Sequence, residues 1–96
     1  MRDAINITWD PAKNRENQRK HGISFDDARA VFQDPDRIDD FYDREYDEER
    51  WIVIGLVGSV IIYVIYTIRD GGIRLISARK ATSHEQARYV FKAWWR

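Results

Sequence analysis

Three apolar runs in the second half of the chain decide its fold: RWIVIGLV at 50–57, VIIYVIYTIR at 60–69 and IRLISARK at 73–80. β-branched and aromatic residues, which favour strands, dominate all three runs. The runs are separated by Gly58-Ser59 and by Asp70-Gly71-Gly72, residue types that tolerate the positive φ of tight hairpin turns. A buried helix over 60–68 is the alternative, but that segment lacks helix caps and is bounded by glycines. The pattern therefore predicts a three-stranded antiparallel meander.

The predicted strands turn polar and cationic at one end. Strict alternation along 73–80 places Arg74, Ile76, Ala78 and Lys80 on one face, and Ile73, Leu75, Ser77 and Arg79 on the other. On the preceding strand, Thr67 shares a face with Arg69. A purely structural sheet does not need cations at these positions, so they are candidates for anion binding.

Length and composition predict one domain of modest core. The chain has 96 residues, of which 44% are hydrophobic, and it has no cysteine. The lack of cysteine excludes disulfides and thiolate metal sites, which fits a reducing cytoplasm. The longest apolar run is too short to span a membrane, and the N-terminus lacks the pattern of a signal peptide. We therefore expect a cytoplasmic protein without membrane association.

The formal net charge of zero hides a partition along the chain. Residues 26–49 carry three basic and eleven acidic side chains, whereas residues 50–96 carry eight basic and two acidic ones. An acidic middle segment followed by a basic sheet and helix indicates a polar molecule. The basic part suits a polyanion, and the acidic part suits either water or a basic protein partner.

The N-terminal part predicts a short strand and two helices. Alternation over Ile5–Trp9 indicates a strand, and Asp10-Pro11 is a strong start signal for a helix that ends at His21 before Gly22. This helix is so polar that we expect it to pack weakly, through Ala12 and the aliphatic stems of long side chains. Ser24 caps a second helix, whose apolar stripe (Phe25, Ala28, Val31, Phe32) should cover the sheet.

The acidic segment and the C-terminus complete the expected architecture. Residues 37–42 suggest an irregular strand, and the segment up to 49 is most simply a solvated, mobile loop. Thr82 and Glu85 form a capping box that begins a final helix. Its face carries Ala87, Val90, Phe91 and Trp94, with Tyr89 and Trp95 off that face. The fold class is therefore α+β: a mostly antiparallel sheet, two N-terminal helices and one C-terminal helix, with the helices largely on one side.

Few motifs for specific chemistry are present. The two histidines, His21 and His84, lack the i, i+4 spacing of a zinc helix, so we expect no metal and no cofactor. No glycine-rich phosphate loop or nucleophile elbow occurs. The strand cations are the most specific feature. They either bind phosphate or pair with the acidic segment.

Four segments in register make the chain similar to a known family. They are ITWDPAKN at 7–14, KHGISFDDA at 20–28, ERW at 49–51 with Ile54-Gly55, and ISARKAT at 76–82 with Glu85. Together they resemble the BrnT toxins of type II toxin–antitoxin pairs. The acidic stretch 36–48 and the tail after Tyr89 fall outside the match.

The resemblance implies a RelE-like fold and a ribonuclease that halts translation. It also implies neutralisation by a BrnA-type antitoxin, whose complex with the toxin represses the operon through the antitoxin's DNA-binding part. The implied reaction is metal-independent attack of a ribose 2′-hydroxyl on the adjacent phosphate. That reaction needs a base, an acid and cations around the phosphate. A non-catalytic module that titrates a DNA-binding partner is the alternative.

On this reading Arg79 is the principal phosphate-stabilising cation, because it shares a face with Ser77 at the polar end of its strand. The secondary candidates are Arg50, Arg69 and Lys80, and His21 is a possible proton carrier if the first helix folds over the sheet. The expected RNA contacts are Arg74, Ser77, Thr67, Lys13, Lys20 and Arg88.

The acidic block would repel phosphate within a Debye length of roughly 8 Å, so RNA should enter from the basic side. The terminal helix suggests a protein contact, because one core face cannot readily bury both Trp94 and Trp95. We expect the antitoxin to dock on Trp94, Trp95, Phe91 and Tyr89 and to cover the cationic face. Alternatively, Trp95 folds back onto the edge of the protein's own sheet.

Overall fold

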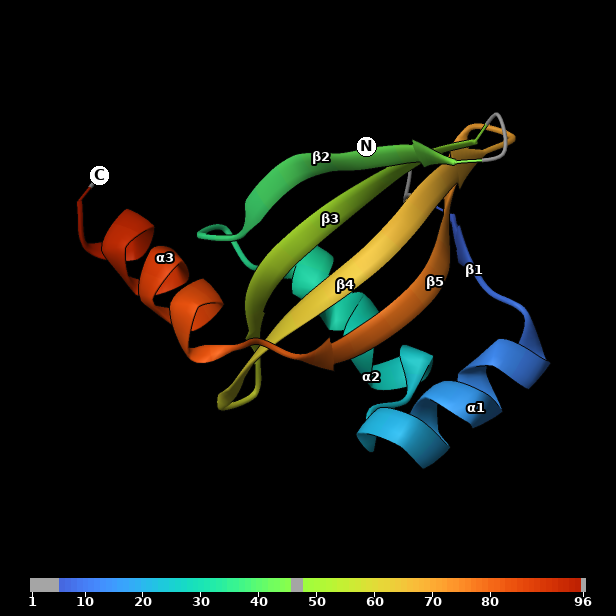
Figure 1. The fold of residues 1–96 in the computed structure, drawn as a ribbon, viewed down its shortest axis with the longest axis horizontal. Helices are drawn as coiled ribbons and strands as arrows, with labels where there is room; N and C mark the ends of the chain where they lie inside the picture. Colours follow the sequence, from blue (N-terminus) through green and yellow to red (C-terminus); the bar gives the residue numbers. More distant parts are fainter. Residues whose placement is uncertain (1–5, 46–47, 96) are drawn as a thin grey trace, which may run out of the picture.

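A computed structural model describes residues 6–45 and 48–95. In chain order its elements are β1 (Ile7–Thr8), α1 (Pro11–His21), α2 (Phe25–Ala28), the 3₁₀ helix η1 (Arg29–Gln33), β2 (Ile38–Glu45), β3 (Glu48–Val57), β4 (Val60–Arg69), β5 (Gly72–Lys80) and α3 (Ser83–Trp94) (Figure 1). The expected start of the first strand at Ile5, and Tyr46 and Asp47 of the acidic segment, lie outside the described residues. The α+β class is confirmed.

The described strands form one five-stranded sheet in the order β1-β5-β4-β3-β2. All neighbours are antiparallel except β1, which runs parallel to β5. The predicted meander is confirmed, with two-residue turns at Gly58-Ser59 and Asp70-Gly71. Asp70 and Gly71 both have positive φ (54° and 76°), as the tight turn requires.

The acidic segment is more regular than expected. β2 is a strand of 8 residues paired along β3, so the prediction of a mobile loop after residue 42 is wrong up to residue 45. β2 is also one of the two edge strands of the sheet. Its apolar Ile38 is buried, which explains why an acid-rich segment is held in place.

A β-bulge corrects the predicted faces of β5. Ile65 pairs with Ser77, whereas the next residue, Tyr66, pairs with Leu75, so Ile76 is the extra residue. From Ser77 onward, each side chain of β5 therefore lies on the opposite face from the one that strict alternation from Ile73 would give. Leu75 and Ala78 therefore share the core face, and the expectation of strict alternation is wrong past Ile76. Arg74, Ser77 and Arg79 lie together on the other face, opposite Thr67, Ile65 and Tyr63 of β4.

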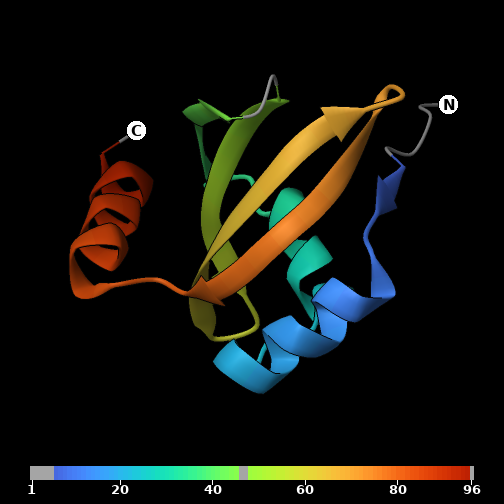
Figure 2. The same ribbon diagram turned by 45° about the vertical axis from the view of Figure 1, so that its right-hand side comes forward.

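Each face of the sheet carries its own apolar cluster. On one face, the predicted stripe of the second helix is confirmed: Phe25, Ala28 and Val31 are fully buried against Val53, Val64 and Leu75. On the other face, Tyr89 of α3 packs with Ile38, Ile52, Ile54 and Tyr63. The expectation that the helices lie largely on one side holds for α1 and α2, whereas α3 covers a corner of the opposite face (Figure 2).

The polar helix α1 is anchored by hydrogen bonds rather than by aliphatic stems. Asn17 is buried, and its side chain accepts from the Ala78 N–H (3.0 Å) and donates to the Ala78 carbonyl (2.7 Å). It also donates to the Ile23 carbonyl. β1 pairs with only the first part of β5. Asn17 therefore supplies backbone partners where that strand edge is otherwise uncovered.

The buried side of α3 differs from the side that its sequence suggests. Tyr89 is 6% exposed and its hydroxyl donates to Asp34 (2.6 Å), whereas Phe91, Trp94 and Trp95 are 64%, 82% and 74% exposed. Trp95 stacks on Phe91 and does not fold back onto the sheet. None of the described helices is long and apolar enough to cross a membrane.

Candidate functional site

A cleft lies on the face of the sheet opposite α2, at one end of β3, β4 and β5. Figure 1 shows that this end of the three strands lies away from α3. The registers of the β3–β4 and β4–β5 hairpins bring the polar side chains of the cleft together. Thr67 pairs with Arg74 across β4 and β5, and Arg50 lies one residue beyond the Trp51–Tyr66 pair of β3 and β4. The cleft has a volume of about 260 Å³ and is lined by Lys13, Glu48, Arg50, Thr67, Arg69, Arg74, Leu75 and Ile76.

The cleft contains four basic side chains and one acid. Glu48 accepts a hydrogen bond from Arg69 at 2.8 Å, which balances that arginine. Among the residues that the structure describes, none forms an ion pair or hydrogen bond with the side chain of Arg74. Thr67 is buried, and its hydroxyl donates to the Glu49 carbonyl, which fixes the centre of the cleft. The cleft therefore has a net positive charge that an anionic ligand can balance.

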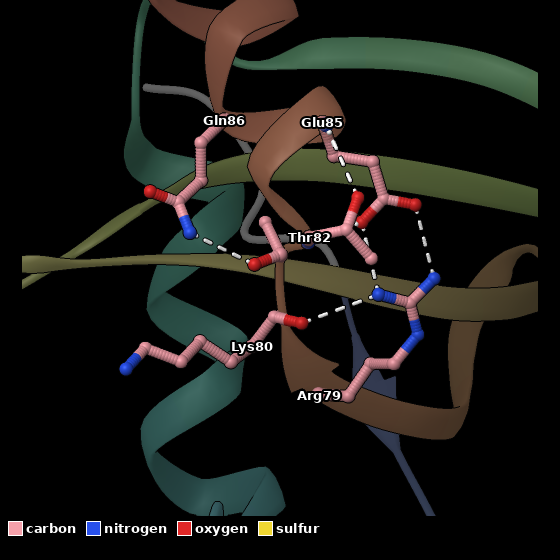
Figure 3. A network of polar contacts seen from close by, with 6 residues as sticks. Arg79, Lys80, Thr82, Glu85 and Gln86 are labelled. Carbon is pink, nitrogen blue, oxygen red and sulfur yellow. Dashed lines mark hydrogen bonds and ion pairs between the residues drawn. The ribbon is translucent and has the colours of Figure 1, made fainter.

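Arg79 lies on the same face in a different setting. Its guanidinium donates twice to Glu85, at 2.9 and 3.0 Å (Figure 3). It also stacks on the ring of Tyr63, 3.9 Å from the ring centroid. The hydrogen bonds from Arg79 hold the pKa of Glu85 below its ordinary value, although burial opposes them. Glu85 also completes the capping box with Thr82. The Arg79 charge is therefore already balanced, unlike that of Arg74.

Arg79 and the cleft are separated along the sheet. Tyr63, the partner of Arg79, and Thr67, the partner of Arg74, are four residues apart on β4, or roughly 13 Å at the usual rise of a strand. Lys80 is exposed, and its side chain points away from the Arg79–Glu85 pair (Figure 3). The structure thus brings Arg50, Arg69 and Arg74 together but leaves Arg79 and Lys80 outside their cleft.

The remaining candidates fall into two places. Lys13, Lys20, His21 and Ser77 line a groove between α1 and β5. Arg88 does not line either space and instead pairs with Asp40 of β2 at 3.1 Å. The alternative role for the cations, pairing with the acidic segment, is therefore realised for Arg69 of β4 and for Arg88 of α3.

Two side chains were missed from the sequence. Glu48 was assigned to a solvated acidic block, although the two-residue turn at 58–59 fixes a register in which it reaches Arg69. Tyr63 was treated as part of an apolar strand, although its ring supports Arg79. Burial raises the pKa of the Tyr63 hydroxyl, so its neutral form is favoured.

By fold and site, the chain is a small α+β domain with a cationic cleft on one sheet face. The family model described as "Ribonuclease toxin, BrnT, of type II toxin-antitoxin system" matches residues 9–85. The chain therefore belongs to the BrnT family of ribonuclease toxins, as the sequence motifs predict. Membership of this family implies an RNA target and an antitoxin partner. No curated protein matches the chain.

Proposed function

We propose that this chain is an endoribonuclease toxin that binds and cleaves RNA at the cleft around Thr67. The observation that supports this most is the side chain of Arg74, which forms no ion pair with any residue that the structure describes and lines the cleft with Arg50 and Arg69. Family membership supplies the substrate class, and the cleft supplies the charge. We also assign the fold to the RelE-like class, on the basis of its mostly antiparallel sheet and flanking helices.

The proposed reaction is a transesterification. The ribose 2′-oxygen forms a bond to the adjacent phosphorus, and the bond from phosphorus to the 5′-oxygen breaks. The products are a 2′,3′-cyclic phosphate and a 5′-hydroxyl. The 2′-hydroxyl loses a proton and the 5′-oxygen gains one, while the phosphate becomes more negative in the transition state. The role of Arg74, with Arg50 and Arg69, is to stabilise that charge.

Proton transfer needs groups that can accept and donate a proton. Among the described residues that line the cleft, Glu48 is the one carboxylate, so it is the candidate base. His21, in the adjoining groove, remains the candidate proton carrier. Arg79 becomes a secondary candidate, because Glu85 already balances its charge.

The proposed partner is a BrnA-type antitoxin that docks on the exposed patch of α3, defined here as Phe91, Trp94 and Trp95. The proposed contact no longer includes Tyr89, because Tyr89 is buried against the sheet. An exposed aromatic patch of this kind on a small domain usually has a partner. In this proposal the complex reaches operator DNA only through the antitoxin, and the toxin acts in the cytoplasm, where translation occurs.

Expression of the chain alone in a bacterial host tests this function. We expect growth arrest with loss of cellular RNA, relief of both by Arg74→Ala, and relief by co-expressed antitoxin. Arg29→Ala is the matched control, since Arg29 is an exposed arginine on η1, whose neighbours pack on the other face of the sheet. If the wild-type chain leaves growth and RNA unchanged, the toxin assignment fails and the non-catalytic, partner-titrating module takes its place.

A further inference from the structure

A second basic groove adjoins the cleft, and among the described residues that line it only His21 has a role in the chemistry proposed above. It lies between α1 and β5, has a volume of about 200 Å³, and is lined by Lys13, Glu16, Asn17, Lys20, His21, Ile76 and Ser77. Its helical wall consists of positions spaced by three or four residues, which is one face of α1. Figure 2 shows α1 lying beside the lower part of β5.

The groove and the cleft adjoin each other. Lys13 and Ile76 line both of them, so the two spaces meet where α1 begins and where β5 bulges. The bulge leaves Ile76 outside the regular pairing and sets it at the boundary between the two spaces. A ligand that extends from the cleft past Ile76 therefore enters the groove.

The groove is also basic and firmly held. Its one acid, Glu16, pairs with Arg19, which does not line the groove, and leaves Lys13 and Lys20 on the wall. Asn17 fixes α1 to β5 through its two hydrogen bonds with Ala78, so the two walls keep their spacing. Rigid walls with cations on one side suit a phosphate backbone.

Starting from the proposed function, we infer that the α1–β5 groove is a subsite for single-stranded RNA, which binds the phosphates of nucleotides that flank the cleaved bond. Among the described residues that line the groove, none is a Trp, Tyr or Phe on which a base could stack. Binding there is therefore through the backbone and tolerates any base sequence. The preferred substrate is a strand of several nucleotides rather than a dinucleotide.

Cleavage of a dinucleotide and of a twelve-nucleotide strand of the same central sequence tests this subsite. The wild-type chain should prefer the long strand in kcat/KM, and Lys20→Ala should reduce that preference. Arg15→Ala is the matched control, because it removes an exposed charge from the same helix outside the groove. Equal losses in the two variants would overturn the subsite and indicate general attraction by charge. Equal cleavage of both substrates by the wild type would overturn it as well.

A binding measurement separates this inference from the proposed function. Fluorescence anisotropy with a 2′-O-methyl strand, which cannot be cleaved, reports binding even if the chain has no ribonuclease activity. We expect Lys20→Ala to reduce the salt dependence of log K by about 0.7, the value for one single-strand phosphate contact. An unchanged slope overturns the subsite, whereas normal binding without cleavage of any RNA refutes only the proposed reaction.

Discussion

Asn17 joins the most polar helix of the chain to the edge of the sheet. It bonds to both backbone groups of Ala78 and to the Ile23 carbonyl. The sequence predicted α1 and both of its ends correctly, but it gave no reason to choose Asn17 over the other polar residues of that helix. The partner of a polar side chain becomes known only when the strand that it meets is placed.

The Asn17→Ala variant tests this anchor. It leaves the buried N–H and C=O of Ala78 without a partner, and we expect a loss of about 2–4 kcal/mol in the free energy of unfolding. Urea denaturation followed by tryptophan fluorescence measures it. The Gln18→Ala variant, exposed on the same helix, should stay within about 0.5 kcal/mol of wild type. A similar small effect for Asn17→Ala would show that the three bonds contribute little.

Asp34 is the residue that ties α3 to the rest of the domain. Burial alone would raise the pKa of Asp34, but hydrogen bonds from Tyr89, the Leu56 N–H and the Asp36 N–H outweigh it, so the pKa lies below its ordinary value of 3.8. A carboxyl with a lowered pKa in the folded state contributes stability that is complete above its ordinary pKa. That contribution is lost as the pH falls through the lowered value.

The Asp34→Asn variant should therefore be less stable than wild type at neutral pH, and the difference should shrink as the pH falls below 3.8. Equilibrium unfolding in urea at a series of pH values measures the difference. A gap between the two proteins that stays constant down to acid pH would show that the Asp34 carboxylate is not linked to folding.

Among the elements, the strands were predicted better than their faces. The turns at 58–59 and 70–71 determine the register of the β3–β4 and β4–β5 hairpins, and that register alone places Glu48 beside Arg69. The bulge at Ile76 was not predictable, because an extra residue in an apolar strand leaves no mark in the pattern. It has a large effect, since it moves Arg79 and Ser77 onto the face of Arg74.

α3 shows a second limit of sequence patterns. An apolar stripe on a helix predicts burial but does not say whether the covering surface belongs to the same chain. Here Tyr89 docks the helix, helped by Lys92, which donates to the Arg37 carbonyl, and by Arg88, which pairs with Asp40. The stripe that includes Phe91 and Trp94 remains exposed.

The Trp94→Ala variant tests the proposed antitoxin contact. Because Trp94 is 82% exposed, its loss should leave the unfolding free energy nearly unchanged. As an aromatic anchor of an interface, it should cost about 2 kcal/mol or more in binding, which is roughly a thirtyfold increase in Kd. Isothermal titration calorimetry with the purified antitoxin measures this. Ile68→Ala is the control, because Ile68 is an exposed apolar residue near the turn at 70–71, away from α3. Equal affinities of the two variants for the antitoxin would exclude the α3 patch from the interface.

At the scale of the whole molecule, the partition of charge along the chain becomes a partition across the sheet. The acidic strand β2 lies at one edge, and β5, next to the basic groove, lies three strands away, about 14 Å at the usual strand spacing. That RNA approaches from the basic side stays a prediction. The sequence placed the cations on the correct strands but ranked Arg79 first, because the ion pair with Glu85 was not visible in it.

Single-turnover cleavage of RNA by the purified chain tests the central claim most directly. We expect products with 2′,3′-cyclic phosphate and 5′-hydroxyl ends. Arg74→Ala should lower the rate about 10²- to 10³-fold, as loss of a donor to the transition state does, and Arg79→Ala should lower it less. Folded Arg74→Ala protein that cleaves at the wild-type rate, or a greater loss for Arg79→Ala, would contradict the assignment of the cleft as the site of cleavage.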